Sequence, residues 1–150
     1  MSRDYSAYFS ANKELWNKRT VVHKDSSFYN LKGFMSGENV LTPIELSELG
    51  DVRDKKLLHL QCHFGMDSLN WARLGAEVTG VDFSDEAVKE AMQLTDNLGL
   101  EAKFICCNVY DLKQHLDKNF DIVFTSYGTI GWLPDLDKWA DIISYYLKPG

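Results

Sequence analysis

The sequence has 150 residues, enough for one domain with a hydrophobic core, and its 45% hydrophobic and 25% charged residues are typical of a soluble globular protein. No apolar run approaches the ~18 residues that a membrane span needs, and the N-terminal MSRDYSAYFS lacks the apolar stretch of a signal peptide. The formal net charge of −6 disfavours a nucleic-acid partner, because the chain has no basic footprint for phosphates.

An N-terminal amphipathic helix is predicted over residues 4–18. Its apolar face repeats near the 3.6-residue helical period and consists of Tyr5, Tyr8, Phe9, Leu15 and Trp16. Residues 20–41 are predicted to form a loop, with Gly33 and Gly37 as helix breakers.

A second short helix is predicted to begin at Thr42-Pro43-Ile44-Glu45. This segment is a capping box with proline at the first helical position, and Gly50 is placed to end the helix. We expect residues 1–54 to form an N-terminal helical lid over an α/β domain of residues 55–150.

Strand and helix patterns alternate after residue 55. The predicted strands cover residues 56–60, 77–81, 103–107 and 121–125, and the predicted helices cover residues 66–74, 84–99 and 135–147. This alternation predicts an α/β fold with a doubly wound, mostly parallel sheet, whose ligands bind outside the carboxyl ends of the strands where the strand order reverses. A fifth strand is expected to begin at Gly150, so we expect an incomplete domain whose fourth strand is an exposed edge that favours instability or association.

Three further sets of residues receive structural interpretations. The last predicted helix has an apolar stripe of Leu136, Trp139, Ala140, Ile143 and Leu147. Tryptophans expected in the core or between helices are Trp71, Trp132 and Trp139. Acidic residues expected on a solvated helix face are Asp85, Glu86 and Glu90.

The three cysteines are Cys62, Cys106 and Cys107, and an odd number without secretory context predicts reduced thiols and a cytoplasmic location. Together with His59 and His63, they raise a metal-binding hypothesis. A structural zinc site needs four converging ligands, whereas Cys106 and Cys107 are neighbours on a predicted strand and point to opposite faces. We therefore predict no metal site.

The turn after the first strand reads Gln61-Cys62-His63-Phe64-Gly65. A ligand-binding turn at this place brings its backbone close to the ligand, which glycines normally permit, and only Gly65 remains of such a pattern. An ordinary tight turn between strand and helix explains these residues equally well.

Two polar residues follow the next two strands. Asp82 comes about 20 residues after Gln61, where a carboxylate accepts hydrogen bonds from ribose hydroxyls. The alternative is an aspartate at a helix entry, although Ser84 already provides a cap. Asn108 can both donate to and accept from an adenine edge, and a turn asparagine is the equally good alternative.

The segment LLHLQCHFGMDSLNWARLGAEVTGVDFSDEAV resembles the first two strands of class I (Rossmann-like) methyltransferases. It is most similar to a bacterial subgroup with HLQCHFG where most members have an acidic residue and three glycines. The resemblance continues through CCNVYDL and FDIVFTSYGTIGWLPDLDKWADIISYYLKPG, covers residues 56–150, and extends more loosely to residues 16–29. His59, Gln61 and His63 depart from the general pattern of the family.

The resemblance implies S-adenosylmethionine as the cofactor and assigns residues to it. Around the methionine part it implies Gln61, Cys62, His63 and Gly65; at the ribose, Asp82; beside the adenine, Phe83, Asn108 and Val109. Ser126, after the fourth strand, is a further expected cofactor contact, and we expect Thr125, Ser126 and Tyr127 to form the floor of the site.

The expected activity is methyl transfer to a small-molecule acceptor. Such a reaction is an in-line displacement at an activated sulfonium, so orientation and exclusion of water are the main tasks of the protein. Tyr127 and His23 are candidates for substrate contact or proton transfer, and aromatic contacts or simple solvent exposure explain them otherwise. The lid would carry His23 and Tyr29 over the site.

Two other functions stay open. A nicotinamide-dependent (NAD(P)) oxidoreductase is disfavoured because the turn lacks the G-x-G-x-x-G spacing. A noncatalytic cofactor-binding or regulatory module of the same fold is compatible with the altered turn, and cofactor binding without turnover would point to it.

Overall fold

The computed structural model describes residues 4–117 and 119–150. Its helices are α1 (Ser6–Lys24), α2 (Leu31–Met35), α3 (Pro43–Leu49), α4 (Met66–Arg73), α5 (Asp85–Leu98) and α6 (Leu136–Tyr146), with the 3₁₀ turns η1 (Val109–Gln114) and η2 (Ile130–Trp132). Its strands are β1 (Lys56–Leu60), β2 (Glu77–Asp82), β3 (Ala102–Cys106) and β4 (Ile122–Thr125). Within the described ranges, no helix is both long and apolar enough to cross a membrane.

The four strands form one parallel sheet in the order β3-β2-β1-β4. The chain moves outward from β1 to β3 and then crosses to the other side of β1, so the strand order reverses between β1 and β4. The predicted doubly wound α/β fold is therefore confirmed, and each predicted strand agrees with the observed one to within a residue at either end. After α6 the chain begins to pair in parallel at Phe120 and Leu147, beside the start of β4.

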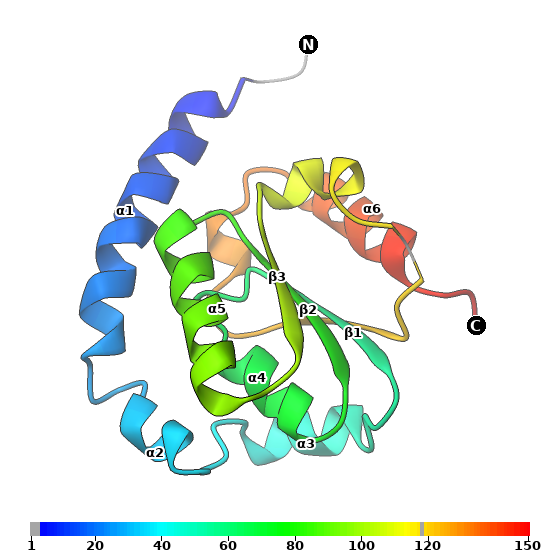
Figure 1. The fold of residues 1–150 in the computed structure, drawn as a ribbon. Helices are drawn as coiled ribbons and strands as arrows, with labels where there is room; N and C mark the ends of the chain where they lie inside the picture. The colour runs from blue at the N-terminus through cyan, green and yellow to red at the C-terminus, as the bar shows by residue number, and fades with distance from the viewer. Residues whose placement is uncertain (1–3, 118) are drawn as a thin grey trace.

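Helices cover both faces of this sheet. Leu58 and Leu60 point from β1 toward η1 and α6, into a cluster that includes Tyr146. Leu57 points to the other face, where it meets Trp71 of α4. Figure 1 shows α1 beside α5 along one side of the molecule and α6 on the opposite side, and α1 and α5 are in direct contact.

The buried face of α6 differs from the predicted stripe. Ile142 and Tyr146 are its fully buried residues, with Trp139 and Ile143 packed beside them. Leu136, by contrast, is 49% exposed, and Ala140 and Leu147 are exposed as well. The prediction placed no tyrosine in the core, but Tyr146 is accommodated there because its hydroxyl donates to the carbonyl oxygen of Leu116 at 2.9 Å.

The N-terminal part is more helical than predicted. α1 continues to Lys24 because residues 19–24 contain neither glycine nor proline, and Thr20 in this extension is buried. The predicted loop is interrupted by α2, whose N-cap Asn30 accepts a hydrogen bond from the N–H of Gly33. Gly33 therefore lies inside a helix and does not break one. α3 begins with the predicted capping box and ends before Gly50, as expected.

Candidate active site

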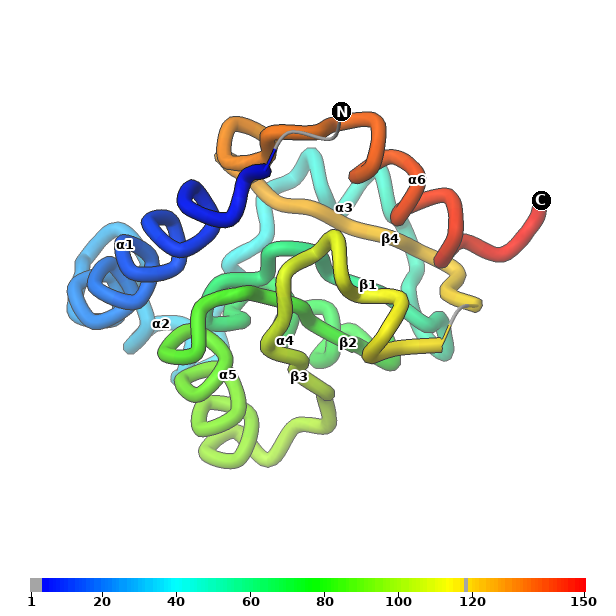
Figure 2. The backbone as a smooth tube through the Cα atoms, turned by 90° about the horizontal axis from the view of Figure 1, so that it is seen from above, coloured from blue at the N-terminus to red at the C-terminus, as the bar shows by residue number. Residues whose placement is uncertain are grey.

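A cavity of about 360 Å³ lies at the carboxyl ends of the strands, next to the point where the strand order reverses. Its volume lies within the ~300–1,000 Å³ range of small-molecule sites. All nine residues predicted to bind a cofactor line it: Gln61, Cys62, His63, Gly65, Asp82, Phe83, Asn108, Val109 and Ser126. Figure 2 looks down on the strands, and α1 crosses one side of this view beside α5.

The turn between β1 and α4 has a left-handed backbone at every second residue. The φ angles of Gln61, His63 and Gly65 are 57°, 53° and 83°. For the two residues that are not glycine, this conformation costs roughly 1–2 kcal/mol each, and such strain concentrates at functional sites. The turn thus has the curvature that glycines would permit, although it carries only one.

Hydrogen bonds to β2 hold this strained turn. The N–H of Cys62 donates to the carbonyl oxygen of Val81 at 2.9 Å, and the N–H of His63 donates to Oδ2 of Asp82 at 2.8 Å. At Gly65 a Cβ would lie 2.9 Å from the ring of Phe104, closer than real Cβ contacts. Gly65 is therefore needed both for its positive φ and for the close approach of β3.

Each carboxylate oxygen of Asp82 accepts a hydrogen bond from a backbone N–H group. Its Oδ1 accepts from the N–H of Ser84 at 2.9 Å, while its Oδ2 holds the N–H of His63. Burial raises the pKa of Asp82, and hydrogen bonds from backbone N–H groups oppose that rise. A carboxylate offers about four lone-pair sites, so acceptor capacity is left on the cavity side. Ser84 separately caps α5, accepting from the N–H of Ala87 at 3.1 Å.

Cys62 and Asn108 line the cavity, but each also has a structural environment of its own. The thiol of Cys62 is buried, and burial raises its pKa well above the usual value. The Oδ1 atom of Asn108 accepts from the N–H of Tyr110 at 3.1 Å, so the residue also serves as the turn asparagine that the sequence allowed. The turn interpretation of Asn108 is therefore confirmed, and its contact with adenine stays a prediction.

His23 does not line the cavity, contrary to the expectation that it contacts substrate. Its Nδ1 lies 3.1 Å from Nε2 of His63, and its ring packs against Trp16 and Tyr29. Burial, with the charge of His23 as a lesser cause, lowers the pKa of His63 to about 3, so His63 is a neutral imidazole at pH 7. His23 thus contacts His63 and not the cavity. It lies there because α1 continues to Lys24.

Trp132, expected in the core or between helices, does pack against α1, but it also lines the cavity. Its ring meets that of Trp16 edge to face with centroids 5.3 Å apart, and the guanidinium carbon of Arg19 lies 5.3 Å from the Trp132 centroid. A signal was present in the sequence, because Trp132 follows a strand in a glycine-containing segment, and loops at the carboxyl ends of parallel strands carry ligand sites. Trp71 and Trp139 do pack in the core as predicted.

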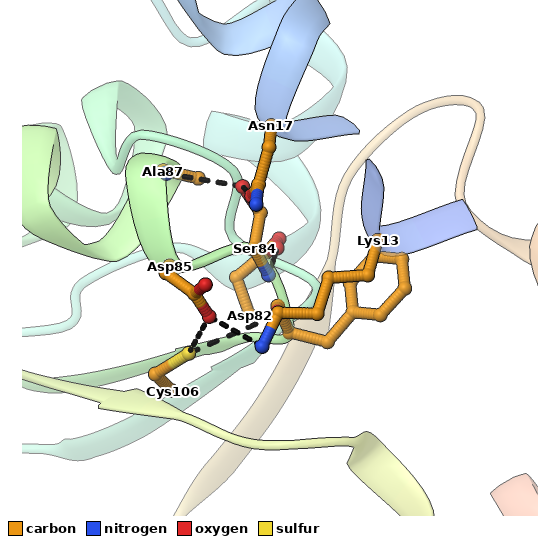
Figure 3. A network of polar contacts seen from close by, with 8 residues as sticks. Lys13, Asn17, Asp82, Ser84, Asp85, Ala87 and Cys106 are labelled. Atoms are coloured by element: carbon orange, nitrogen blue, oxygen red, sulfur yellow. Dashed lines mark hydrogen bonds and ion pairs between the residues drawn. The ribbon is translucent and has the colours of Figure 1, made fainter. Parts of the chain in front are cut away.

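Polar contacts join α1 to the start of α5, as Figure 3 shows. Lys13 forms an ion pair with Asp85, and the hydroxyl of Ser84 donates to Oδ1 of Asn17 at 2.6 Å. Ser84 follows the β2 end that carries Asp82, so α1 is tied directly to the cavity wall.

The acidic face of α5 is not simply solvated, as the sequence suggested. Asp85 pairs with Lys13, and Glu90 accepts from Lys24 at 3.0 Å. The prediction of a solvated face is therefore wrong for Asp85 and Glu90, because α1 lies against this part of α5.

The expected floor is partly correct. Ser126 and Tyr127 line the cavity, Thr125 does not, and Thr129 takes a place in the wall. Tyr127 is 67% exposed and its hydroxyl lies 3.2 Å from Oγ1 of Thr42, so it belongs to the rim.

Two acidic residues that the sequence analysis did not select also line the cavity. Asp67 stands in the first turn of α4, and Glu45 belongs to the capping box of α3, where its Oε2 accepts from the N–H of Thr42. Burial, followed by the charge of Glu45, raises the pKa of Asp67 to about 6. An acid two residues after the glycine of a ligand-binding turn was the signal that could have identified Asp67.

His59 of β1 is buried and does not line this cavity. Nδ1 of His59 lies 2.7 Å from Oγ of Ser68, and burial lowers the pKa of His59 to about 3. Among the residues that the structure describes, no three side chains of the His, Cys, Asp or Glu types are grouped so that they could hold a metal ion.

Comparison with known proteins identifies the family. Residues 57–150 match the family model described as a methyltransferase domain. The chain is similar to the ubiquinone biosynthesis O-methyltransferase of Chromobacterium violaceum, with 28% identity over 130 residues that cover 85% of this chain and 53% of the relative. The chain spans about half the length of the curated relatives it matches.

Solved structures share the fold. A SAM-dependent methyltransferase from Thiobacillus denitrificans, in complex with S-adenosyl-L-homocysteine, aligns with a TM-score of 0.57 and 21% identity over 81% of this chain and 52% of that chain. The T. thermophilus 16S rRNA N2 G1207 methyltransferase, in complex with AdoMet and guanosine, aligns with a TM-score of 0.61 and 25% identity over 76% of this chain and 34% of that one.

The cavity has groups that fit S-adenosylmethionine. Oε1 of Gln61 is a buried acceptor without a donor among the described residues, and Asp82 keeps acceptor capacity for a hydroxyl. Because the family model covers well over half of the sequence, the chain belongs to the methyltransferase domain family, with a Rossmann-like fold and S-adenosylmethionine as that family's cofactor.

Proposed function

We propose that the chain catalyses transfer of a methyl group from S-adenosylmethionine to a small-molecule acceptor by in-line displacement. The observation that carries the proposal is a cavity lined by residues that follow the carboxyl ends of all four strands. The similarity to ubiquinone biosynthesis O-methyltransferases supports a small organic acceptor.

The strand order suggests how the cofactor lies. Asn108 follows β3, Asp82 ends β2, and the turn at residues 61–65 follows β1, so these groups succeed one another across the sheet. Neighbouring strands are about 4.8 Å apart, which separates the first and last of these positions by roughly 10 Å. That span suits a nucleoside joined to an amino-acid chain, with adenine near Asn108, ribose at Asp82 and the methionine part along the turn.

The residues of the chain then orient and shield the reactants. When bound, the cofactor supplies an activated methyl group on a sulfonium. Trp16, Tyr29 and Trp132 form an aromatic wall that excludes water. The described part of the expected lid, residues 4–54, brings two of these three rings to the cavity. His63, with a pKa of about 3, is too weak a base to take a proton efficiently. Tyr127, at the rim, is the proposed acceptor contact.

A small acceptor fits this site better than a nucleic acid. The net charge of −6 opposes binding to phosphates, and the described residues that line the cavity include three carboxylates but neither lysine nor arginine.

Calorimetric titration of the chain with S-adenosylmethionine, and with NADH as a control, tests the proposal. We expect micromolar binding of S-adenosylmethionine and none of NADH. Asp82→Ala should weaken binding at least about tenfold, the equivalent of ~1.4 kcal/mol. Because Asp82 also holds the turn, Phe83→Ala is a second variant that leaves those hydrogen bonds intact, and Asp96→Asn on the exposed side of α5 is the control.

Turnover is then measured as release of S-adenosylhomocysteine with a panel of phenols, amines and thiols. Cofactor binding without turnover on any acceptor would favour the noncatalytic module. Binding of NADH would favour the oxidoreductase. Failure to bind either ligand would overturn the proposed function.

A further inference from the structure

Exposed apolar side chains surround the opening of the cavity. Phe28 and Tyr127 line the cavity, although Phe28 is 85% exposed and Tyr127 is also mostly exposed. Ile44 of α3 and Ile130 of η2 are each next in sequence to a residue that lines the cavity, and both are more than half exposed. We call these four residues the outer rim.

The outer rim is built from three segments that meet at the cavity. The hydroxyl of Tyr127 lies 3.2 Å from Oγ1 of Thr42, which joins the loop after β4 to the start of α3. The ring of Phe28 meets that of Tyr29 edge to face with centroids 5.1 Å apart, and Tyr29 lines the cavity. A single exposed apolar side chain is ordinary, whereas a group of them around a cavity marks a surface that binds something apolar.

The outer rim lies on the side of the cavity that is left for the acceptor. The residues proposed to bind the cofactor follow β3, β2 and β1, whereas Tyr127 and Ile130 follow β4, on the other side of β1. The wall that continues inward from the outer rim includes the apolar side chains Val40 and Leu133. The cavity of about 360 Å³ is near the lower limit for one drug-sized ligand, so a cofactor in place leaves an acceptor to extend outward over the outer rim.

Charge narrows the kind of group that the outer rim can bind. Its four side chains carry no charge, and the chain as a whole has a net charge of −6. Phosphates of a nucleic acid or of an anionic lipid surface are therefore repelled and find no cation on the outer rim. An uncharged apolar group avoids this repulsion and removes exposed apolar surface from water.

We infer that the methyl acceptor is amphipathic, with a nucleophilic group that enters the cavity and an apolar chain that lies on the outer rim. The inference rests on the proposed function and adds to it the class of the substrate. Phe28 and Ile130 are then residues that determine specificity: they contact the apolar chain of the acceptor and take no part in methyl transfer.

Matched pairs of small molecules test this class whatever the nucleophile is. The pairs are phenol and para-butylphenol, aniline and para-butylaniline, and thiophenol and para-butylthiophenol. Calorimetry gives the Kd of each compound for the chain saturated with S-adenosylhomocysteine, and turnover with S-adenosylmethionine gives kcat and KM. The variants are Phe28→Ala and Ile130→Ala. Their controls are Met92→Ala and Val22→Ala, at exposed positions that neither line the cavity nor adjoin a lining residue.

A fully buried CH₂ group strengthens binding about fourfold, and the open rim covers only one side of a chain. We therefore expect the butyl compound of at least one pair to bind about tenfold more tightly than its parent. Phe28→Ala and Ile130→Ala should each lower this ratio to about fourfold and change the Kd of the parent by less than about twofold, whereas the controls keep the ratio. The gain should appear in KM and not in kcat, because the chain contacts the rim equally in the ground and transition states.

Three results would overturn the inference: equal affinity within every pair, a tenfold ratio kept by both variants, or no binding of any of the six compounds to the loaded chain. Sedimentation with phosphatidylcholine vesicles adds a fourth. Vesicle binding that Phe28→Ala abolishes would assign the outer rim to a membrane surface instead. If the unsubstituted chain did not bind S-adenosylhomocysteine, the proposed function itself would fail, and that outcome is recognised before any acceptor is added.

Discussion

The sheet and α1 are attached to the molecule in different ways. Leu57, Leu58 and Leu60 of β1 are 0% exposed and make contact on both faces of the sheet. Of the residues of α1, all of which the structure describes, Thr20 alone is buried. α1 is held instead by two ion pairs to α5, one exposed and one part-buried, and by aromatic rings that lie at the cavity.

The difference separates stability from ligand binding. A fully buried leucine contributes roughly 1.5–3 kcal/mol, whereas an exposed ion pair contributes ~0–1 kcal/mol. Elements with few buried contacts open at low free energy without unfolding the domain. We therefore expect changes in β1 to affect the free energy of unfolding, and changes in α1 to affect ligand affinity and local opening.

The largest expected effect comes from the sheet. Leu58→Ala should lower the free energy of unfolding by about 3 kcal/mol, because it leaves a cavity in the cluster beneath α6. Urea denaturation followed by tryptophan fluorescence measures the loss. Val22→Ala, at a position of α1 that is 67% exposed, should change it by less than about 0.5 kcal/mol. Similar losses in the two variants would contradict the comparison.

Asp67 should make stability depend on pH. Its pKa is about 6 in the folded state against an ordinary 3.8, so the folded state holds the proton more tightly than the unfolded state. Protonation therefore stabilises the fold below about pH 4, and this stabilisation is lost as the pH rises from about 4 to 6. Asp67→Asn should accordingly raise the free energy of unfolding by about 1–3 kcal/mol at pH 7 and by much less at pH 4.

Denaturation at the two pH values, with Asp96→Asn as the control, measures this difference. A gain for Asp67→Asn of the same size at pH 4 and pH 7 would show that the charge of Asp67 is not its source. Glu45, which faces Asp67, is the neighbouring titratable group that contributes to the shift.

Trp16 tests the role of α1 at the cavity. Trp16→Ala removes a ring whose centroid lies 5.3 Å from both His63 and Trp132. We expect about tenfold weaker binding of S-adenosylhomocysteine, or ~1.4 kcal/mol, with less than about 1 kcal/mol lost in unfolding. Leu15→Ala, on the same helix but outside the cavity wall, is the control. A larger effect on the free energy of unfolding than on binding would show that Trp16, like the buried residues of the sheet, contributes mainly to stability.

The smallest effect is expected for the ion pair that ends α1. Lys24→Ala removes the contact with Glu90 and should cost about 0.5 kcal/mol or less, seen as roughly twofold faster hydrogen exchange of α1 amides. Lys18→Ala is matched to it, because Lys18 pairs with Glu14 within α1 and does not reach α5. The difference between the two variants should disappear in 1 M salt, where exposed charges are screened. Persistence in high salt would point to lost packing of the lysine stem.

Several parts of the molecule were predictable from local pattern. Strand bounds, the capping box of α3 and the start of α5 at Ser84 follow from hydrophobic period and capping chemistry, which act within a few residues. The residues expected around the cofactor come together because parallel strands bring their carboxyl ends to one edge. Their assignment to particular atoms of the cofactor stays a prediction.

The turn at residues 61–65 and the environment of α1 depended on tertiary contacts. Positions 61 and 63 carry no glycine, so the sequence pattern did not indicate their left-handed backbone. Hydrogen bonds to Asp82 and Val81 of the next strand hold that backbone. The surroundings of His23 and Trp132 likewise result from contacts between segments far apart in the chain.

The sequence by itself determined the order of strands and helices, the parallel sheet and the edge at which the site lies, because hydrophobic periodicity and caps act within a few residues and alternating strands and helices make a parallel sheet. Only the tertiary structure decided which charges and rings meet: Asp85 and Glu90 with α1, and Asp67 with Glu45 in the cavity. An amphipathic pattern shows which face of a helix is apolar, but the partner of a charged or aromatic side chain is set by the placement of whole elements.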